Sequence, residues 1–288
     1  MKNLPPICFG CEPLGGTDWG DVNMDDMKQA IHTALDLGVN FFDTAGVYGL
    51  GLSEERLSKI LGDHRHDVVI ATKGGLSWNS DNLGRASIRK DSSSSAIRKD
   101  VESSLKRLRL ECLPIFYIHW PDENIPFSET FGELEKIRDE GKIESIGCSN
   151  FSVSQMKEAS SISKIKYTQL PINILSGALD KDIEDICTKK EIAIVAYNVL
   201  ANGLLSGKYH KDSIFPKNDR RSHLPLFRGA LYHEALETIK ELKVRASCND
   251  MSISQYAINW TLSQPNILSA IVGIKNSQQI KDNWSAVI

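Results

Sequence analysis

The sequence predicts an α/β fold in a single domain, a closed (β/α)8 TIM barrel that spans residues 1–288. Short β-rich runs alternate with longer amphipathic segments from end to end. Several of the runs are unbroken apolar stretches, as is typical of strands buried on both faces in a parallel sheet. Eight such runs joined by helical crossovers favour a closed barrel. An open doubly wound sheet would also alternate, so the count of runs alone leaves that alternative open.

The expected elements follow in order along the chain. The strands are Ile7–Phe9, Val39–Asp43, Val68–Lys73, Ile115–His119, Ser145–Cys148, Tyr167–Gln169, Ala193–Tyr197 and Ala270–Gly273. Helical periods between them include Met24–Leu37, Leu52–Leu61, Ser95–Leu108 and Phe131–Glu140. Gly38 and Gly141 stand where glycine commonly ends a helix. The stretch Tyr209–Arg228, here called the basic segment, shows no clear period. It follows the seventh strand and is therefore expected at the C-terminal mouth of the barrel.

Composition excludes several classes of protein. Lys and Arg number 34 against 37 Asp and Glu, so the basic excess of a nucleic-acid-binding protein is absent. No apolar stretch approaches the roughly 20 residues that span a bilayer, and the first residues lack the apolar run of a signal peptide. The six cysteines are spread widely, unlike a disulfide framework. We therefore expect a cytoplasmic protein, a monomer or weak oligomer, with neither a nucleic-acid nor a membrane partner.

Two cysteine- and glycine-containing motifs do not predict a site. Cys8 and Cys11 have the spacing of a metal-binding pair, but no second pair matches them, so core cysteines are expected and no metal site. The run Gly203–Tyr209 has one residue too few for a phosphate-binding loop and a tyrosine where the magnesium ligand should stand. No glycine fingerprint follows a strand, so a dinucleotide would have to be held without a Rossmann turn.

Four polar residues gather at the expected C-terminal mouth. Asp43, Lys73 and His119 end three successive expected strands, and Tyr48 lies in the loop after the first of them. Taken alone, the three strand-end residues each have an ordinary structural explanation: a helix N-cap for Asp43, a lysine that reaches solvent for Lys73, and a satisfied core histidine for His119. Their matching positions on adjacent strands instead predict one catalytic site.

This set of residue types suits carbonyl reduction. A hydride that arrives at a carbonyl carbon builds negative charge on the oxygen, which needs a hydrogen-bond donor and a proton. Tyr48 can give the proton, and the Lys73 ammonium is expected to lower the pKa of that tyrosine. Asp43 can pair with Lys73, since a buried lysine needs a partner. His119 can orient the substrate oxygen.

With these residues the sequence resembles the aldo-keto reductases over nearly its whole length. The four residues match the tetrad of that family, and the surrounding motifs are similar as a set. These motifs are Asp43-Thr44-Ala45, Tyr48-Gly49, Ser53-Glu54, His119-Trp120-Pro121-Asp122 and Gly147-Cys148-Ser149-Asn150-Phe151. The likeness is nearest to bacterial members that include general-stress and sugar-type reductases. It implies the same barrel and hydride transfer between a nicotinamide cofactor and a small carbonyl or alcohol.

The resemblance also implies a set of cofactor-binding residues. Ser149, Asn150 and Gln169 would hold the carboxamide, and Tyr197 would stack on the nicotinamide. The remaining positions are Asn198, Leu200, Gly273, Lys275, Gln279 and Asn283. Many members carry arginine at the position of Gln279 to bind the 2′-phosphate, and Lys275 can replace it. NADPH/NADP+ is therefore expected, with NADH/NAD+ as an open alternative.

The substrate side of the site is less constrained. Aromatic residues that could line it are Trp19, Trp78 and Trp120. Glu12 stands where the family often has Met, Trp or Thr, so it either faces substrate or is a solvated loop carboxylate. In the basic segment, Arg220 and Arg221 could clamp the cofactor pyrophosphate or an anionic substrate such as a sugar phosphate. The alternative is a solvated charged loop.

Two other functions stay open at this point. A cofactor-binding barrel without turnover, or with slow turnover, could regulate a partner, as potassium-channel β subunits resemble reductases. A barrel aldolase could use Lys73 as a Schiff-base nucleophile. That lysine would need a depressed pKa, whereas Asp43 beside it would raise the pKa.

Overall fold

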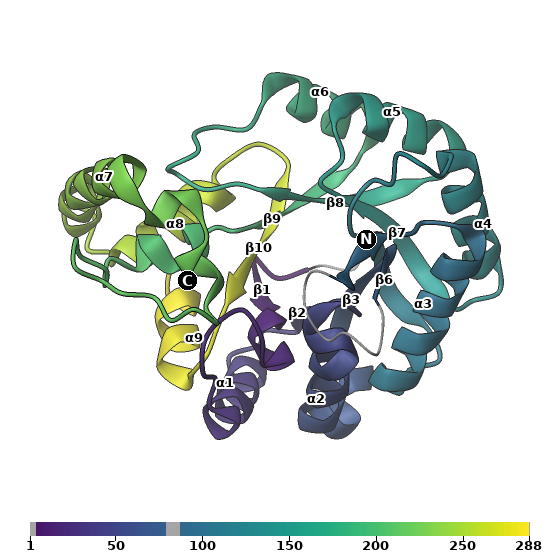
Figure 1. Ribbon diagram of the computed structural model, residues 1–288, viewed down its shortest axis with the longest axis horizontal. Coiled ribbons are helices and arrows are strands. Elements are labelled where there is room, and N and C mark those ends of the chain that lie inside the picture. The colour runs from purple at the N-terminus through teal and green to yellow at the C-terminus, as the bar shows by residue number, and fades with distance from the viewer. Residues whose placement is uncertain (1–3, 79–86, 288) are drawn as a thin grey trace.

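The computed structural model describes residues 4–78 and 87–287 and confirms the (β/α)8 barrel. Eight parallel strands close in the order β1-β10-β9-β8-β7-β6-β3-β2, and helices surround them (Figure 1). The barrel strands are β1 (Ile7–Gly10), β2 (Phe41–Asp43), β3 (Val69–Gly74), β6 (Leu113–Ile118), β7 (Ile143–Ser149), β8 (Ile165–Pro171), β9 (Ala193–Tyr197) and β10 (Ile267–Gly273).

Each expected strand overlaps an observed one, with small differences at the ends. The second begins at Phe41 rather than Val39. His119 lies one residue beyond β6, yet its N–H still donates to the Gly74 carbonyl across 3.0 Å, so it continues the ladder. Sequence reasoning missed the antiparallel pair β4 (Leu76–Ser77) and β5 (Arg89–Lys90).

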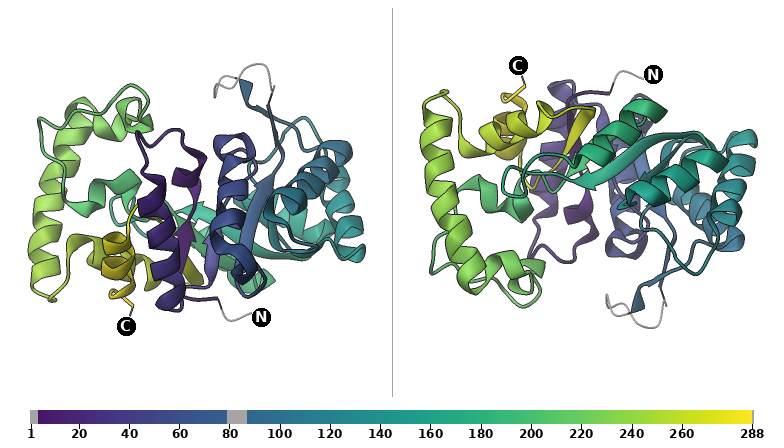
Figure 2. Two further views of the ribbon diagram at one scale, coloured as in Figure 1. Left: turned by 90° about the horizontal axis from the view of Figure 1, so that it is seen from below. Right: turned by 90° about the horizontal axis from the view of Figure 1, so that it is seen from above.

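The helices lie outside the barrel, as Figure 2 shows from two sides. They are α1 (Met24–Asp36), α2 (Leu52–Leu61), α3 (Ser94–Leu108), α4 (Phe127–Asp139), α5 (Val153–Ile162), α6 (Lys181–Lys190), α7 (Gly229–Ser247), α8 (Ile253–Leu262) and α9 (Ser277–Trp284). Side chains that accept hydrogen bonds from the first turn fix where several begin; Ser152 and Ser252 each form a capping box. Gly38 and Gly141 have positive φ, as expected after a helix end. None of the helices described is long and apolar enough to cross a membrane.

The alternation of side chains along the strands makes two cores. Cys8, Phe41 and Tyr117 point into the barrel, whereas Phe9 and Phe42 pack outward against the helices. Cys8 and Cys11 are both buried and free, as expected of core cysteines. Within residues 4–78 and 87–287, no three His, Cys, Asp or Glu side chains are grouped to hold a metal ion.

The basic segment packs against α7 and against the loop after β1. It contains two 3-10 turns, η6 (Arg220–Ser222) and η7 (Pro225–Phe227). Its aromatic rings pack with α7, and Phe227 lies in the cluster that α7 and α8 share with η5 (Ala201–Ser206). An isolated bridge joins Asp219 to Trp19, so the segment is tied to the loop after β1.

Candidate active site

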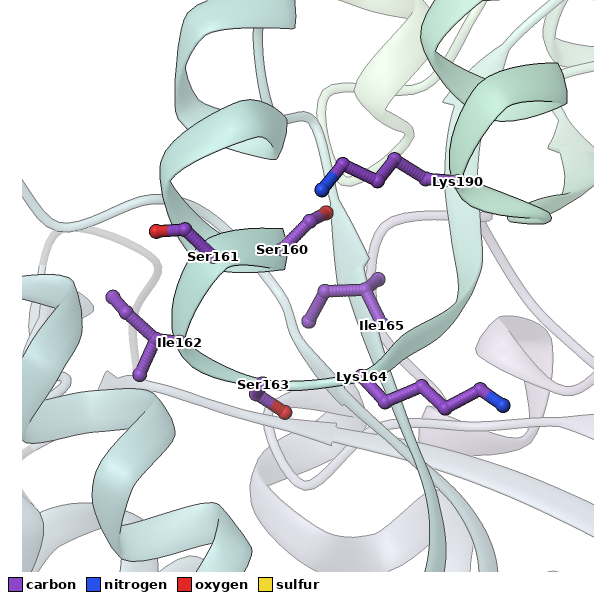
Figure 3. A pocket seen from close by; sticks show the side chains of 7 residues that line it. All are labelled: Ser160, Ser161, Ile162, Ser163, Lys164, Ile165 and Lys190. Atoms are coloured by element: carbon purple, nitrogen blue, oxygen red, sulfur yellow. The ribbon is translucent and has the colours of Figure 1, made fainter.

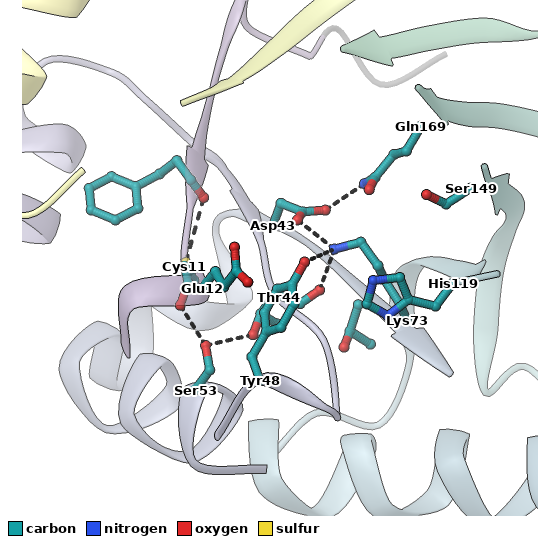
Figure 4. A network of polar contacts seen from close by, with 12 residues as sticks. Cys11, Glu12, Asp43, Thr44, Tyr48, Ser53, Lys73, His119, Ser149 and Gln169 are labelled. Atoms are coloured by element: carbon teal, nitrogen blue, oxygen red, sulfur yellow. Dashed lines mark hydrogen bonds and ion pairs between the residues drawn. The ribbon is translucent and has the colours of Figure 1, made fainter. Parts of the chain in front are cut away.

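Asp43, Tyr48, Lys73 and His119 converge at the C-terminal mouth of the barrel, as the sequence predicts (Figure 4). Asp43 ends β2, Lys73 lies near the end of β3, and Tyr48 begins η2 (Tyr48–Gly51). The rings of Tyr48 and His119 meet edge to face, with 5.8 Å between centroids and 84° between planes.

The Lys73 ammonium lies at the centre of this group. It donates to Asp43 Oδ1 across 2.6 Å, to the Thr44 carbonyl across 2.9 Å and to the Tyr48 hydroxyl oxygen across 3.4 Å. Asp43 Oδ2 accepts from Gln169 Nε2 across 2.5 Å. All three ammonium protons therefore have acceptors. Because Tyr48 accepts from Lys73, its own hydroxyl proton is directed away from the lysine.

The pKa of Tyr48 differs from the expectation. Burial raises it well above its ordinary value, the negative charges of Glu12 and Asp43 raise it further, and Arg220 lowers it. The prediction that the pKa of Tyr48 is lowered was therefore wrong in direction. The reason is that the burial of Tyr48, together with the charges of Glu12 and Asp43, outweighs the influence of the Lys73 ammonium.

Close packing of two loops positions Tyr48. Gly49 has φ of 59°, and a side chain there would overlap the carbonyl of Gly15, at the end of η1 (Glu12–Gly15). The Ser53 hydroxyl donates to the Cys11 carbonyl across 2.8 Å, which joins the loop after β1 to α2. These contacts place Glu12, on the first of these loops, next to Tyr48 on the second (Figure 4).

A buried network beneath the site was not predicted as functional. Glu54 is fully buried; it accepts from Thr72 across 2.6 Å and from Arg107 Nε across 2.6 Å. It therefore joins α2, β3 and α3 directly behind Lys73. The available signal was the position of Glu54 on the helix face that also carries Leu57 and Leu61.

Ser149, Asn150, Gln169 and Tyr197 come together at the ends of β7, β8 and β9. Asn150 Nδ2 donates to the His119 carbonyl across 3.0 Å, and its Oδ1 accepts from the Tyr197 hydroxyl across 2.6 Å. The same amide donates to Ser149 across 3.0 Å. These side chains therefore lie at the same mouth of the barrel as the four central residues, as expected of residues that would hold a nicotinamide.

The turn after β9 has an unusual backbone. Asn198, Ala201, Asn202 and Gly203 all have positive φ, and Leu200 precedes η5 as its half-buried N-cap. The Asn198 side chain accepts from the Asn202 N–H across 2.8 Å. These left-handed residues make a tight turn at the C-terminal end of β9, on the same side of the barrel as Tyr48.

The segment after β10 lies on the same side of the barrel as the turn after β9, but its residues differ in their exposure to solvent. Gly273 is exposed, and Lys275 Nζ donates to the Trp19 carbonyl across 2.6 Å. Gln279 accepts from the Lys275 N–H across 2.8 Å and so closes the start of α9. Asn283 is only 5% exposed on the inner face of that helix. Of the four expected contacts here, Gly273 and Lys275 are thus the best placed.

The donors in this region fit an anionic cofactor. Trp19 Nε1 and Arg220 Nε are buried, and neither has a hydrogen-bond partner in the part of the chain described. Burial first, and then the charge of Arg221, lower the pKa values of Lys208 and Lys275, which shows how closely the positive groups are gathered. Trp19 contacts Asp219 and Arg220 of the basic segment, and its expected place in the substrate pocket stays a prediction.

The arginines of the basic segment are paired within the protein. Arg220 meets Glu12 across 3.0 Å, and Arg221 forms an ion pair with Asp219. Glu12 is therefore not a solvated loop carboxylate. Of the other predicted pocket residues, Trp120 is 41% exposed directly after His119. The Trp78 side chain lies beside Gly46, and Gly46 belongs to the loop that leads to Tyr48.

A hollow of about 300 Å³ lies elsewhere (Figure 3). It is lined by Ser160, Ser161, Ile162, Ser163, Lys164, Ile165 and Lys190. These residues surround the start of β8, at the end of the barrel opposite Tyr48. In barrels of this type that end contributes to stability, whereas active sites form at the other.

Comparison with known proteins agrees with this geometry. Residues 6–288 match the model of the aldo/keto reductase family. Aldo-keto reductase YhdN of Bacillus subtilis (strain 168) is 32% identical over 278 residues, 96% of this chain and 82% of that protein. The NADH-specific methylglyoxal reductase of Escherichia coli (strain K12) is 28% identical over 285 residues, 95% of this chain and 86% of that protein.

A solved structure is also similar. The glycerol dehydrogenase AKR11B4 from Gluconobacter oxydans superposes with a TM-score of 0.89 at 34% identity, over 99% of this chain and 87% of that one. Both the fold and the sequence match over nearly the whole length, and together they lead to one conclusion. The chain belongs to the aldo/keto reductase family.

Proposed function

We propose that this protein reduces small aldehydes or ketones with NADPH, and oxidises the corresponding alcohols in reverse, with Tyr48 as the proton donor. Membership in the family makes it an oxidoreductase that acts on carbonyl and alcohol groups with a nicotinamide cofactor. The finer proposal rests on the contacts of the Lys73 ammonium at the barrel mouth. It donates hydrogen bonds to both Asp43 and the Tyr48 hydroxyl oxygen.

Each of the four central residues has a role that follows from its contacts. When bound, the cofactor supplies a hydride to the carbonyl carbon. Tyr48 gives its proton to the oxygen on which charge develops, and Lys73 stabilises the tyrosinate that remains. Asp43 holds Lys73 in position from its other side. His119, beside the Tyr48 ring, orients the substrate oxygen.

The raised pKa of Tyr48 keeps its hydroxyl protonated near neutral pH, which is the form that reduction uses, but it also makes the hydroxyl a weaker acid. Burial and two carboxylates raise that pKa. The reverse reaction needs a tyrosinate as base. Its rate is therefore expected to rise as the pH rises toward the raised pKa.

The positive groups around Trp19 favour NADPH. Lys208, Arg221 and Lys275 lie close enough for their charges to act on one another. An extra phosphate would relieve that repulsion and gain charge-assisted hydrogen bonds. NADH stays an alternative, since one relative is named as NADH-specific.

Titration of the purified protein with NADPH and NADH, followed by a panel of small carbonyl compounds, tests the proposal. We expect NADPH to bind at least about tenfold more tightly, which is about 1.4 kcal/mol, and carbonyl compounds to be reduced. Tight cofactor binding without turnover would instead favour a regulatory barrel. Failure to bind either cofactor would contradict the proposal entirely.

A further inference from the structure

An ion pair between Glu12 and Arg220 lies next to the proposed proton donor. Glu12 follows β1 directly, and Arg220 belongs to the basic segment, 208 residues later. Arg220 Nη1 is 3.0 Å and 3.4 Å from the two carboxylate oxygens of Glu12. The side chains are 29% and 24% exposed, so a small solute can reach them. Figure 4 shows Glu12 beside the Tyr48 ring.

This pair is fixed in place from both sides. The Arg220 N–H donates to the Asp18 carbonyl across 2.8 Å, and the guanidinium lies over the Trp19 ring, 5.4 Å from its centroid. On the other side, the contact between Gly15 and Gly49 ties the loop of Glu12 to that of Tyr48. Glu12 is therefore a positioned group rather than a mobile surface carboxylate.

The charges of both residues reach the reacting hydroxyl. After burial, Glu12 is the largest influence that raises the pKa of Tyr48, and Arg220 opposes it. The same two charges act in opposite directions on the pKa of Tyr197. A carboxylate here makes Tyr48 a weaker proton donor. Glu12 therefore does not assist proton transfer, which leaves a role in substrate binding.

We propose that Glu12, held by Arg220, determines specificity by accepting a hydrogen bond from a hydroxyl on the carbon next to the substrate carbonyl. The site would thus select neutral α-hydroxy carbonyl compounds. This inference rests on the proposed function, because it needs a carbonyl seated at Tyr48. A carboxylate is an acceptor only, and hydrogen bonds to charged groups are stronger than neutral ones.

The balance of charge points away from anionic substrates. Asp43 is matched by Lys73 and Glu12 by Arg220, so these four side chains carry no net charge. A substrate carboxylate or phosphate would meet Glu12 at close range and would have to displace it from Arg220. Like charges brought together in a half-buried site repel, which disfavours such a substrate.

The test compares three small ketones of similar shape: hydroxyacetone, butanone and pyruvate. In the unmodified protein we expect kcat/KM for hydroxyacetone to exceed that for butanone by about 10-fold or more, as one charge-assisted hydrogen bond allows, with pyruvate the poorest. In Glu12→Leu the hydroxyacetone-to-butanone ratio should fall toward one. Glu12→Gln keeps a neutral acceptor and should give an intermediate ratio, which also covers the case in which the leucine variant fails to fold.

The same substitution elsewhere provides the control. Glu237→Leu removes a carboxylate that pairs with Lys240 on the exposed surface of α7, and it should leave the ratio unchanged. A ratio that stays the same in Glu12→Leu, or equal losses for both ketones, would overturn the inference. If the unmodified protein bound cofactor but reduced neither ketone, the proposed function would fail instead. Displacement measurements on the cofactor complex would then still compare the affinities of hydroxyacetone and butanone.

Discussion

Replacement of Tyr48 by phenylalanine is expected to lower kcat for carbonyl reduction by about 10²- to 10⁴-fold, the usual contribution of a positioned proton donor. The ring and its edge-to-face contact with His119 stay, so the site keeps its shape. What disappears is the hydroxyl that accepts from Lys73 across 3.4 Å. Kinetics at saturating cofactor measure the loss, and fluorescence titration should show that cofactor affinity is nearly unchanged.

A matched substitution separates this effect from a general loss of structure. Tyr256→Phe removes a hydroxyl on α8, within the cluster that packs α7 and α8 together. It should leave kcat nearly as it was. If Tyr48→Phe retained more than about a tenth of the original kcat, less than the 10²-fold effect of a true donor, another group would have to deliver the proton.

The second large effect concerns stability. Lys73→Met is expected to lower the free energy of unfolding by about 3–5 kcal/mol, because it leaves the Asp43 carboxylate buried without its partner. The two side chains are only 2% and 5% exposed, so water cannot take the place of the ammonium. Urea unfolding followed by circular dichroism gives the change. Turnover should be lost as well.

A double substitution and a surface control make this result specific. Lys73→Met combined with Asp43→Asn removes both charges and should recover part of the stability. Lys136→Met breaks a pair with Glu133 in which the lysine is 71% exposed, so the expected loss is below about 1 kcal/mol. A loss of similar size in Lys73→Met would show that the buried pair contributes little.

The barrel could be predicted because its strands carry a strong signal. Strands of a parallel barrel are buried on both faces, so the first residues of β3, Val69-Ile70-Ala71, form an unbroken apolar run. The pair β4 and β5 has only two residues in each strand, too few for a periodic pattern. The basic segment owes its shape to contacts with α7 and with Trp19, which no local pattern records.

The central residues could be predicted because strand ends place them. Asp43, Lys73 and His119 each lie at or just beyond the end of a strand, so phasing alone brings them to one mouth. The pair of Glu12 and Arg220 could not be found that way, since 208 residues separate its members. The predicted direction of the Tyr48 pKa shift was wrong because the burial of Tyr48 and the approach of Glu12 appear only in three dimensions.

The most direct test of the central claim is to follow a labelled hydride. NADPH deuterated at the hydride-donating carbon of the nicotinamide is mixed with the protein and a small ketone, and the alcohol is examined by mass spectrometry. The account predicts one deuterium on the former carbonyl carbon, at a rate that nearly vanishes in Tyr48→Phe. Bound cofactor with no deuterium transferred to any carbonyl compound would contradict it, and would mean that the barrel binds nicotinamide without performing the reduction.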